Sequence, residues 1–310
     1  MIEEYSIVSE SVPDALDGER VDRVVSFITG ASRSVVSRFI KDGEVLRNDT
    51  PVKKGSDKVT SGDRIVVDSA LLTNSIEIKP DSEITVPIVH EDESCVVVDK
   101  PSGLVVHPAA SQKDGTLVNG LLSLYPEIAD VGDSGRPGIV HRLDKGTSGL
   151  LVVARSNKCY LALTQQLQER TIERTYTALI VGELEAERGI IDAPLGRDPK
   201  NPVRRAVISG GKEARTRYEI IERFEFPHPC SLVRCQLETG RTHQIRAHFS
   251  AIGHPIVGDS LYGGSNTSID LTRPFLHSSS LIFKHPASNE NLEFTSTIPQ
   301  ELLRTLEGIQ

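Results

Sequence analysis

One short stretch of the chain concentrates the residue types that could carry out chemistry. Residues 138–155 read GIVHRLDKGTSGLLVVAR, with the carboxylate of Asp144 between Arg142 and Lys145. The glycine and hydroxyl residues after Asp144 predict a tight turn, and the apolar run 150–154 predicts a strand buried on both faces. A loop that a rigid strand supports is well placed to hold a reactive carboxylate, although an aspartate in such a turn more often only bonds its own backbone.

Part of this stretch resembles a known signature. The run HRLDKGTSGL at 141–150 is similar to the signature of the RluA/RluD family of pseudouridine synthases, in which the aspartate is the catalytic residue. Further runs resemble motifs of the same family and stand in the family's order. They are KPSGLVVHP at 100–108, ERTYTALIVG at 173–182 and LETGRTHQIRAHFSAIGHPIVGDSLYG at 237–263. Several motifs in one order are far more specific than any single motif.

The resemblance implies roles for individual residues. Asp144 would be the catalytic carboxylate, and Arg246 would hold it in its ionised form, with Arg241 as the second candidate for that partner. Tyr176 would be a platform for the target base and could handle the proton that leaves C5, although a half-buried strand tyrosine is common in any sheet. Arg142 would fill the gap that a flipped nucleotide leaves in the RNA stack. The other candidate RNA contacts near this site are His141, Lys145, Thr147 and His243.

The reaction that the resemblance implies needs no cofactor. Pseudouridine synthesis breaks the bond between N1 of uracil and C1′ of ribose, turns the base and rejoins it through C5, so no electron or external group is transferred. No metal centre is expected either, because His243 and His248 lack the i, i+4 spacing of two helical metal ligands. The 4 cysteines form no C-x-x-C pair, and we interpret them as buried thiols in a reducing compartment.

A basic module precedes this region. Residues 20–64 contain ten Lys and Arg but only six Asp and Glu, in a chain of formal net charge −8. Apolar residues at helical spacing predict helices over 20–28 and 33–41, followed by short strands at 44–47 and 64–67. This pattern resembles an S4 domain, which binds structured RNA; the alternative is a solvated basic face. The candidate RNA contacts here are Arg33, Arg38, Lys41, Lys53 and Lys54.

One turn of this module departs from the S4 pattern. The chain has Arg47-Asn48-Asp49 where S4 domains usually have Val-Asn-Gly. We expect the turn to survive, because asparagine and aspartate tolerate the left-handed conformation that glycine would take.

A second cluster of positive charge is expected in the body of the chain. Residues 197–217 contain seven Lys and Arg against two acids, Asp198 and Glu213, whereas the rest of the body is acidic. The segment 194–205 is rich in proline and glycine, which predicts a loop. We interpret it as a surface that faces RNA phosphates. Its candidate contacts are Arg197, Lys200, Arg204 and Arg205.

These patterns together predict an α+β protein. A small N-terminal S4 domain of the αL type is expected first, then a pseudouridine synthase domain with a mixed, mostly antiparallel sheet flanked by helices. The apolar runs 281–283 and 292–294 predict edge strands. The expected parts are an N-terminal arm at 1–17, the S4 domain at 18–70, a linker at 71–83 and the catalytic domain at 84–310.

The expected function is isomerisation of specific uridines in RNA, with 23S ribosomal RNA or a pre-ribosomal large subunit as the partner. The acidic start lacks the apolar core of a signal peptide, and no apolar run approaches the ~20 residues of a membrane span. A cytoplasmic monomer without a membrane partner is therefore expected. Two alternatives stay open: a non-catalytic RNA-binding or ribosome-assembly protein on the same scaffold, and a small-molecule hydrolase, which would normally need a second positioned acid.

Overall fold

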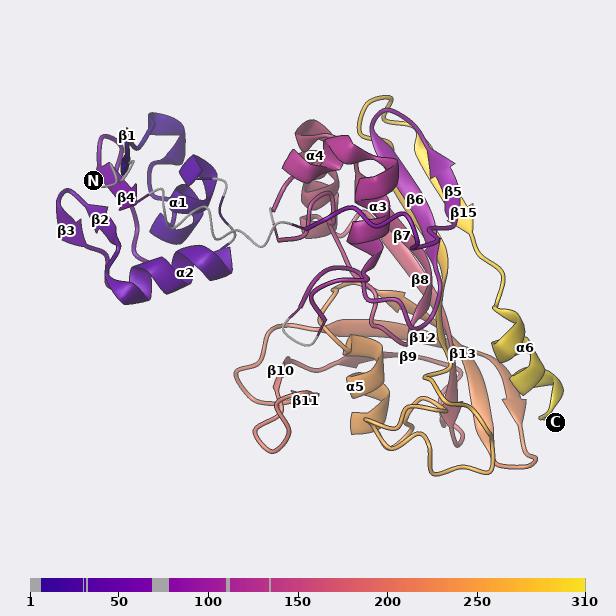
Figure 1. Cartoon of the computed structure of the whole chain (residues 1–310). Helices are drawn as coiled ribbons and strands as arrows, with labels where there is room; N and C mark the ends of the chain where they lie inside the picture. The colour runs from indigo at the N-terminus through magenta and orange to yellow at the C-terminus, as the bar shows by residue number, and fades with distance from the viewer. Residues whose placement is uncertain are drawn as a thin grey trace. The chain divides into compact units, whose positions relative to one another are not determined.

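The computed structural model describes residues 7–29, 31, 33–68, 78–109, 112–133 and 135–309. The chain divides into two compact units (Figure 1). The first unit consists of Met1–Lys79 and Ala129–Pro137, and the second consists of Pro80–Ile128 and Gly138–Gln310. Most of the linker expected over 71–83, and residues 1–6 of the expected arm, lie outside the described residues.

The first unit packs two helices against a small antiparallel sheet. Val21, Val24 and Val25 stand three and four positions apart, and their burial fixes the inward face of the first helix. They share one apolar core with Phe39 and Val67. The elements are η1 (Asp14–Leu16), α1 (Val21–Thr29), α2 (Arg33–Asp42) and, in sheet order, β1 (Ile7–Ser11), β4 (Arg64–Asp68), β2 (Val45–Arg47) and β3 (Thr50–Pro51).

The turn between β2 and β3 has the expected left-handed conformation. Asn48 and Asp49 have φ angles of 50° and 62°. The Asn48 side chain holds the turn, because its Nδ2 donates to Asp63 Oδ1 at 2.7 Å and its Oδ1 accepts from the Arg64 amide at 2.8 Å. The expectation that Asn-Asp can replace Asn-Gly here is confirmed.

The second unit is organised around a 9-stranded sheet. Its strands follow the order β5-β6-β7-β14-β8-β13-β12-β9, and β15 also pairs with β14. Among these described pairs only β7 and β14 run parallel, which confirms a mixed, mostly antiparallel sheet. The strands are β5 (Ile88–Glu91), β6 (Cys95–Lys100), β7 (Ser148–Ala154), β8 (Glu173–Val181), β9 (Arg188–Asp192), β12 (Arg215–Phe224), β13 (Cys230–Leu237), β14 (Leu276–Lys284) and β15 (Asn291–Thr295).

The centre of this sheet positions the loop that contains Asp144. β7 follows that loop and is buried along its whole length, as its apolar run predicted. β14 lies between β7 and β8, so the expectation that the run 281–283 forms an edge strand was wrong. The strand begins earlier, at Leu276, and its next two residues, His277 and Ser278, are polar yet buried because they pair with β7.

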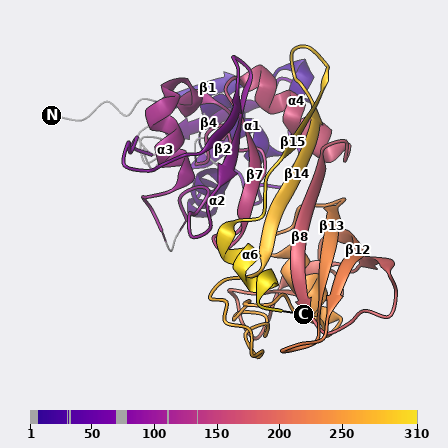
Figure 2. The ribbon, with the colours of Figure 1, turned by 90° about the vertical axis from the view of Figure 1, so that its right-hand side faces the viewer.

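Helices cover both faces of the sheet. Figures 1 and 2 show α3 and α4 on one side and α6 on the other. Thr116 and Asn119 form a reciprocal capping box at the start of α3. None of the described helices is long and apolar enough to cross a bilayer. The helices are α3 (Leu117–Leu124), η3 (Pro126–Asp130), α4 (Asn157–Gln168), α5 (Gln244–Ala251) and α6 (Gln300–Glu307).

The segment 194–205 is more ordered than the loop that its composition predicted. It contributes β10 (Leu195–Arg197) and the start of β11 (Arg205–Val207), which pair antiparallel as a separate two-stranded sheet. Proline and glycine mark only the connection between these strands. We call residues 195–207 the basic hairpin.

Candidate active site

Asp144 lies in a loop that a neighbouring turn holds in place. This turn directly follows β6, and its Gly103 amide donates to the Lys145 carbonyl at 2.7 Å. The Ser102 hydroxyl donates to the Gly146 carbonyl at 3.1 Å. Two hydrogen bonds on the residues just after Asp144 therefore fix the backbone that presents its carboxylate.

The end of the loop requires a glycine. Gly149 has a φ of 112°, and a Cβ at this position would overlap the backbone of Ser278 on β14. Thr147, expected among the RNA contacts, is buried, and its amide donates to the Asp144 carbonyl at 3.0 Å. Both residues thus shape the turn on which Asp144 lies.

Asp144 pairs with a buried arginine. Arg246 Nη1 lies 3.1 Å from Asp144 Oδ2. The other side of the same guanidinium binds Asp259 in a bidentate manner, with Nε to Oδ2 at 2.6 Å and Nη2 to Oδ1 at 2.9 Å. Burial alone would lower the pKa of Arg246, but the hydrogen bonds to Asp259 and the two carboxylate charges raise it. Arg246 therefore stays charged beside Asp144.

The two arginine candidates are separated by the start of α5. His243 precedes the helix with a φ of 57°, and Arg246 lies within its first turn. Arg241 precedes the helix, is exposed, and donates from Nε to the Glu213 carbonyl at 2.9 Å. Arg246, and not Arg241, is thus the arginine that the structure places against Asp144.

His243 and Tyr262 complete the surroundings of Asp144. His243 Nε2 lies 3.9 Å from Asp144 Oδ2, and its Nδ1 lies 3.0 Å from the Tyr262 hydroxyl. The Arg246 guanidinium lies over the Tyr262 ring, 5.0 Å from its centroid. Burial lowers the pKa of His243, although the charge of Asp144 opposes that shift. A neutral imidazole next to the carboxylate is the result.

Tyr176 and His141 are two further candidates of this unit. Tyr176, on β8, is only 4% exposed, and burial raises the pKa of its hydroxyl. His141 Nε2 accepts a hydrogen bond from the Val152 amide at 3.1 Å. Burial, together with the charge of Arg174, lowers the pKa of His141 to about 3. His141 is therefore neutral and bonded to the backbone of β7.

The site also contains residues that no role was predicted for. Asp259 and Tyr262 lie inside the motif at 237–263, but nothing in their spacing indicated contact with Arg246. Lys100, in the motif at 100–108, is fully buried, and its Nζ donates to the carbonyls of Pro101 and Leu104 at 2.8 and 2.9 Å. Burial lowers the pKa of Lys100 to about 7, against the opposing effect of Asp144. Membership of a motif was the one signal that could have found these residues.

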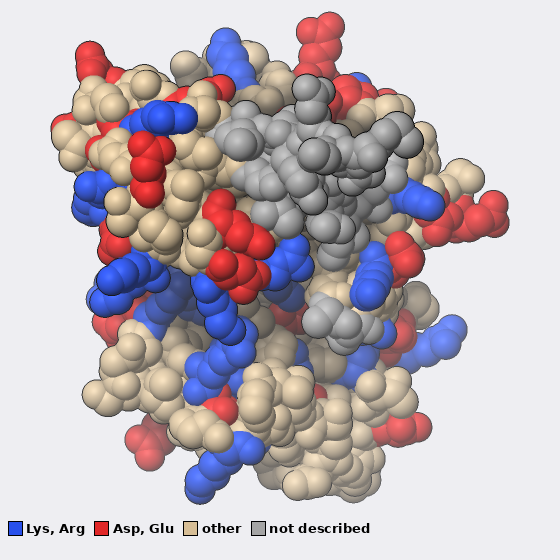
Figure 3. All heavy atoms as spheres, turned by 60° about the vertical axis from the view of Figure 1, so that its left-hand side comes forward, with Lys and Arg blue, Asp and Glu red and all other residues tan. Residues whose placement is uncertain are grey.

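The cationic candidates are mostly exposed. Arg142 and Lys145 flank Asp144 at the surface of the second unit, and Arg204 in the basic hairpin is half-buried. Figure 3 shows one face of the molecule, on which groups of Lys and Arg side chains alternate with Asp and Glu. The side chain of Arg33 lies outside the described residues. The other exposed candidates are Arg38, Lys41, Lys53 and Lys54 in the first unit and Arg197 and Lys200 in the basic hairpin.

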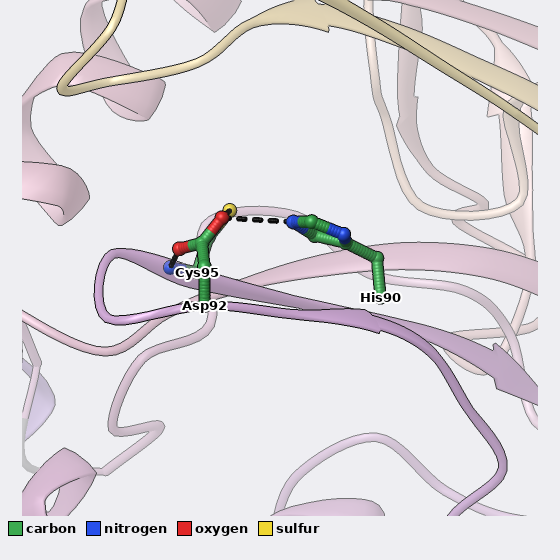
Figure 4. A group of neighbouring side chains, drawn as sticks. All are labelled: His90, Asp92 and Cys95. Atoms are coloured by element: carbon green, nitrogen blue, oxygen red, sulfur yellow. Dashed lines mark hydrogen bonds and ion pairs between the residues drawn. The ribbon is translucent and has the colours of Figure 1, made fainter.

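Within the described residues, one group has the spacing of metal ligands: His90, Asp92 and Cys95 (Figure 4). Its polar atoms already bond to one another and to the backbone. Asp92 Oδ1 accepts from the amides of Ser94 and Cys95 at 2.7 and 2.9 Å, and its Oδ2 lies 2.8 Å from His90 Nε2. These bonds close the turn between β5 and β6 and hold the pKa of Asp92 at about 2, against the opposing effect of burial. We interpret the group as a turn structure.

The chain is similar to known proteins in sequence and in fold. Residues 94–251 match the model of the RNA pseudouridylate synthase family, and residues 19–65 match that of the S4 domain. Ribosomal large subunit pseudouridine synthase D of Pseudomonas aeruginosa is 42% identical over 305 residues, which cover 94% of this chain and 92% of that one. The uncharacterized RNA pseudouridine synthase YlyB of Bacillus subtilis is 40% identical over 293 residues, 94% of each chain. The structure of human RNA pseudouridylate synthase domain containing 1 matches with a TM-score of 0.56 and 28% identity, over 71% of this chain and 86% of that one.

Proposed function

Because this chain belongs to the RNA pseudouridylate synthase family, we propose that it isomerises specific uridines in large-subunit ribosomal RNA, with Asp144 as its catalytic carboxylate. The observation that carries the proposal is the ion pair between Asp144 and Arg246, 3.1 Å long, in a loop whose sequence matches the family signature. Relatives of about 40% identity support large-subunit ribosomal RNA as the substrate. They include the protein of Pseudomonas aeruginosa and are named ribosomal large subunit pseudouridine synthase D.

The reaction is an exchange of two bonds within one nucleotide. The N1–C1′ bond of uridine breaks, the C5–C1′ bond forms, C5 loses its proton and N1 gains one. The substrate and product therefore have the same composition, and the protein needs to supply only positioning, charge and proton transfer.

Asp144 would act in its ionised form. Attack by its oxygen on C6 of the base, attack on C1′ of the sugar, and stabilisation of an eliminated sugar all need a carboxylate without a proton. Arg246 supports that form, because a charged guanidinium in contact with a carboxylate favours the anion. The bidentate contact of Arg246 with Asp259 keeps the guanidinium oriented toward Asp144.

The target uridine must leave the RNA helix to reach Asp144. We propose that Arg142, which is exposed two residues before Asp144, fills the space left in the stack. Tyr176, close enough to Asp144 to respond to its charge, would pack against the extruded uracil and relay the proton that leaves C5, passing on its own hydroxyl proton as it takes up the new one.

The exposed cations would bind the RNA backbone. We assign phosphate contacts to Arg197, Lys200 and Arg204 in the basic hairpin, and to Lys41 and its exposed basic neighbours in the first unit. We also propose that the protein acts in the cytoplasm as a monomer, where it would meet 23S ribosomal RNA or the pre-ribosomal large subunit.

The decisive experiment maps pseudouridine in ribosomal RNA from cells with and without the gene. Because pseudouridine and uridine have equal mass, the mapping uses chemical derivatisation that stops reverse transcription. Without the gene, pseudouridine should be lost from specific positions of large-subunit RNA. A wild-type copy of the gene should restore the pseudouridines at these positions, whereas an Asp144→Ala copy should not. A matched control, Asp192→Asn, removes an exposed carboxylate that pairs with Arg215 at 2.6 Å and should restore them fully.

Two results would overturn the proposal. Full restoration by Asp144→Ala would remove the carboxylate from the mechanism. An unchanged map without the gene, combined with a defect in ribosome assembly that Asp144→Ala rescues, would point to a non-catalytic assembly protein.

A further inference from the structure

Tyr262 connects two parts of the second unit that have separate proposed tasks. Tyr262 is 4% exposed and packs in one apolar cluster with Leu195 of the basic hairpin and Ala247 of α5. One end of this side chain therefore contacts the hairpin proposed to bind phosphates. The other contacts the groups that surround Asp144.

On the hairpin side, the Tyr262 hydroxyl binds the backbone of β11. It accepts from the Arg205 amide at 2.8 Å and lies 3.2 Å from the Arg205 carbonyl. The Arg204 guanidinium also lies over the ring, 4.9 Å from its centroid. The position of the hairpin segment that contains these two arginines is thus tied to the position of Tyr262.

On the site side, Tyr262 contacts both groups that face Asp144. The guanidinium of Arg246 lies 5.0 Å from the ring centroid, and the His243 imidazole meets the ring edge-on, with centroids 5.7 Å apart at an interplanar angle of 89°. The hydroxyl lies 3.0 Å from His243 Nδ1. Any displacement of Tyr262 therefore changes the surroundings of Arg246 and His243 together.

The protons of this network can be assigned from its partners. His243 Nε2 faces the Asp144 carboxylate, so the proton of the neutral imidazole belongs on Nε2 and Nδ1 is left as an acceptor. The Tyr262 hydroxyl has one hydrogen. It can donate either to His243 Nδ1 or to the Arg205 carbonyl, but not to both. A shift of the hairpin thus changes which of them receives the hydrogen bond.

We propose that Tyr262 is a positioning residue that couples the docking of RNA phosphates on the basic hairpin to the alignment of Arg246 and His243 at Asp144. This proposal rests on the proposed function, since it concerns how RNA bound outside the same site affects the residues around Asp144. Contact with a phosphate moves or fixes the hairpin. Tyr262 transmits this change to the Asp144–Arg246 ion pair through its hydrogen bonds to Arg205 and His243 and through the contact of its ring with Arg246.

The test compares Tyr262→Phe with wild type on a short RNA that contains the target uridine. Loss of the hydroxyl frees the hairpin strand but keeps the ring beside Arg246. We expect kcat to fall about five- to tenfold, the effect of about one hydrogen bond, because docking on the hairpin no longer aligns His243 and Arg246, with the KM for RNA within about threefold. Tyr262→Leu also removes the ring and should lower kcat by a further factor of about ten.

A double-mutant cycle separates coupling from simple loss of structure. Lys200→Ala removes an exposed cation of the hairpin and should lower kcat/KM in wild type, but by a smaller factor in Tyr262→Phe, because contact with the freed hairpin no longer aligns the site. Tyr125→Phe is the matched control: Tyr125 is 7% exposed, its hydroxyl bonds to Glu91, and the Arg155 guanidinium lies 4.7 Å from its ring centroid. Its cycle with Lys200→Ala should be additive.

The outcomes distinguish the two proposals. Additive effects of Tyr262→Phe and Lys200→Ala, with kcat unchanged by Tyr262→Phe in a protein that unfolds at the wild-type temperature, would overturn the coupling alone. Absence of pseudouridine formation by wild type on every ribosomal RNA tested would overturn the proposed function itself.

Discussion

At the scale of single residues, the site depends on one guanidinium shared between two carboxylates. Asp259 takes two of the nitrogens of Arg246 and leaves Nη1 for Asp144. Asp259 is 1% exposed, and besides Arg246 its Oδ1 accepts a hydrogen bond from the Tyr262 amide at 3.3 Å. The role of Asp259 is to fix the plane of the guanidinium, because a bidentate contact defines an orientation that a single hydrogen bond does not.

We predict that Asp259→Asn impairs both stability and turnover. Arg246 would keep one carboxylate and lose the bidentate contact, and breaking a buried pair costs about 3 kcal/mol of unfolding free energy. The misaligned guanidinium should lower kcat by about a hundredfold, while the KM for RNA changes little because Asp259 is buried away from the RNA. Urea unfolding and single-turnover kinetics would measure both. Wild-type kcat in Asp259→Asn would contradict this role.

Lys100 allows a prediction about pH. Its pKa is about 7 in the folded protein, because burial disfavours the ammonium group, whereas an exposed lysine in the unfolded chain keeps its proton to above pH 10. Between these values the unfolded state binds more protons, so the free energy of unfolding rises with pH. Relative to Lys100→Met, wild type should gain about 2 to 3 kcal/mol of stability between pH 6 and pH 9. Urea denaturation of both proteins at each pH measures this difference, and a constant difference would show that Lys100 does not titrate in this range.

At the scale of elements, the close contact between β7 and β14 determines where the Asp144 loop ends. The two strands pair in parallel at only two positions, His277 with Ser148 and Ser278 with Gly149. Ser148 Oγ lies 3.0 Å from His277 Nδ1, and Ser278 Oγ donates to the Leu150 carbonyl at 3.1 Å. Polar side chains thus close the contact from both sides.

Gly149→Ala should disrupt this contact. The new Cβ would overlap the Ser278 backbone, and the φ of 112° disfavours any L side chain. We expect a loss of about 3 kcal/mol or more of unfolding free energy, together with a fall in kcat, because the loop cannot keep Asp144 in place. Gly210→Ala is a suitable control, since Gly210 also has a positive φ, of 78°, but has open space around it. An equally small effect of both substitutions would show that the strand contact does not position the loop.

Helices and strands with a regular pattern of apolar residues were predictable from the sequence. Apolar residues at helical spacing identified α1 and α2, and a continuous apolar run identified β7. Elements whose stability comes from partners distant in the chain were missed or misread. His277 and Ser278, near the start of β14, are polar because they bond to β7. The tertiary contacts of these residues, and not the sequence pattern, account for this part of the strand. The helix α6 was also missed, although Leu302, Leu303 and Leu306 stand at helical spacing; only Leu302 is buried.

The site shows the same limit. The motif identified Asp144 and proposed Arg246, and a choice between Arg246 and Arg241 needed the start of α5. Asp259 and Tyr262 follow Arg246 by 13 and 16 residues. They lie in an irregular segment, where no helical or strand periodicity predicts the direction of a side chain. Only the folded chain brings them to the guanidinium.

At the scale of the whole molecule, charge is divided unequally along the chain. The first unit exposes Lys41, Lys53 and Lys54, and the stretch 20–64 has an excess of four positive charges, whereas the rest of the chain is strongly acidic. An acidic body repels RNA except where cations gather, which favours binding through defined patches.

Deletion of residues 1–70 should therefore weaken selection of the correct uridine more than chemistry. We expect a large fall in kcat/KM on full-length 23S RNA, but a small fall on a short RNA that contains the target. Lys53→Ala combined with Lys54→Ala is the matched variant that leaves the chain intact, and it should shift kcat/KM in the same direction with a weaker dependence on salt. Equal losses on the long and the short RNA would count against a role of this unit in site selection.

The burial of every cysteine has a consequence for how the two units could be observed. Cys95, Cys159, Cys230 and Cys235 are all free and buried, and burial raises the pKa of Cys230 to about 11. Such thiols are poor nucleophiles, so a maleimide dye should leave the native protein unlabelled. A cysteine introduced on each unit at an exposed residue outside the proposed RNA contacts, as in Ser56→Cys with Val203→Cys, would then accept a fluorescent donor and acceptor without any change to the natural thiols. The energy transfer between the dyes would follow the separation of the S4 unit and the hairpin while RNA is bound and released.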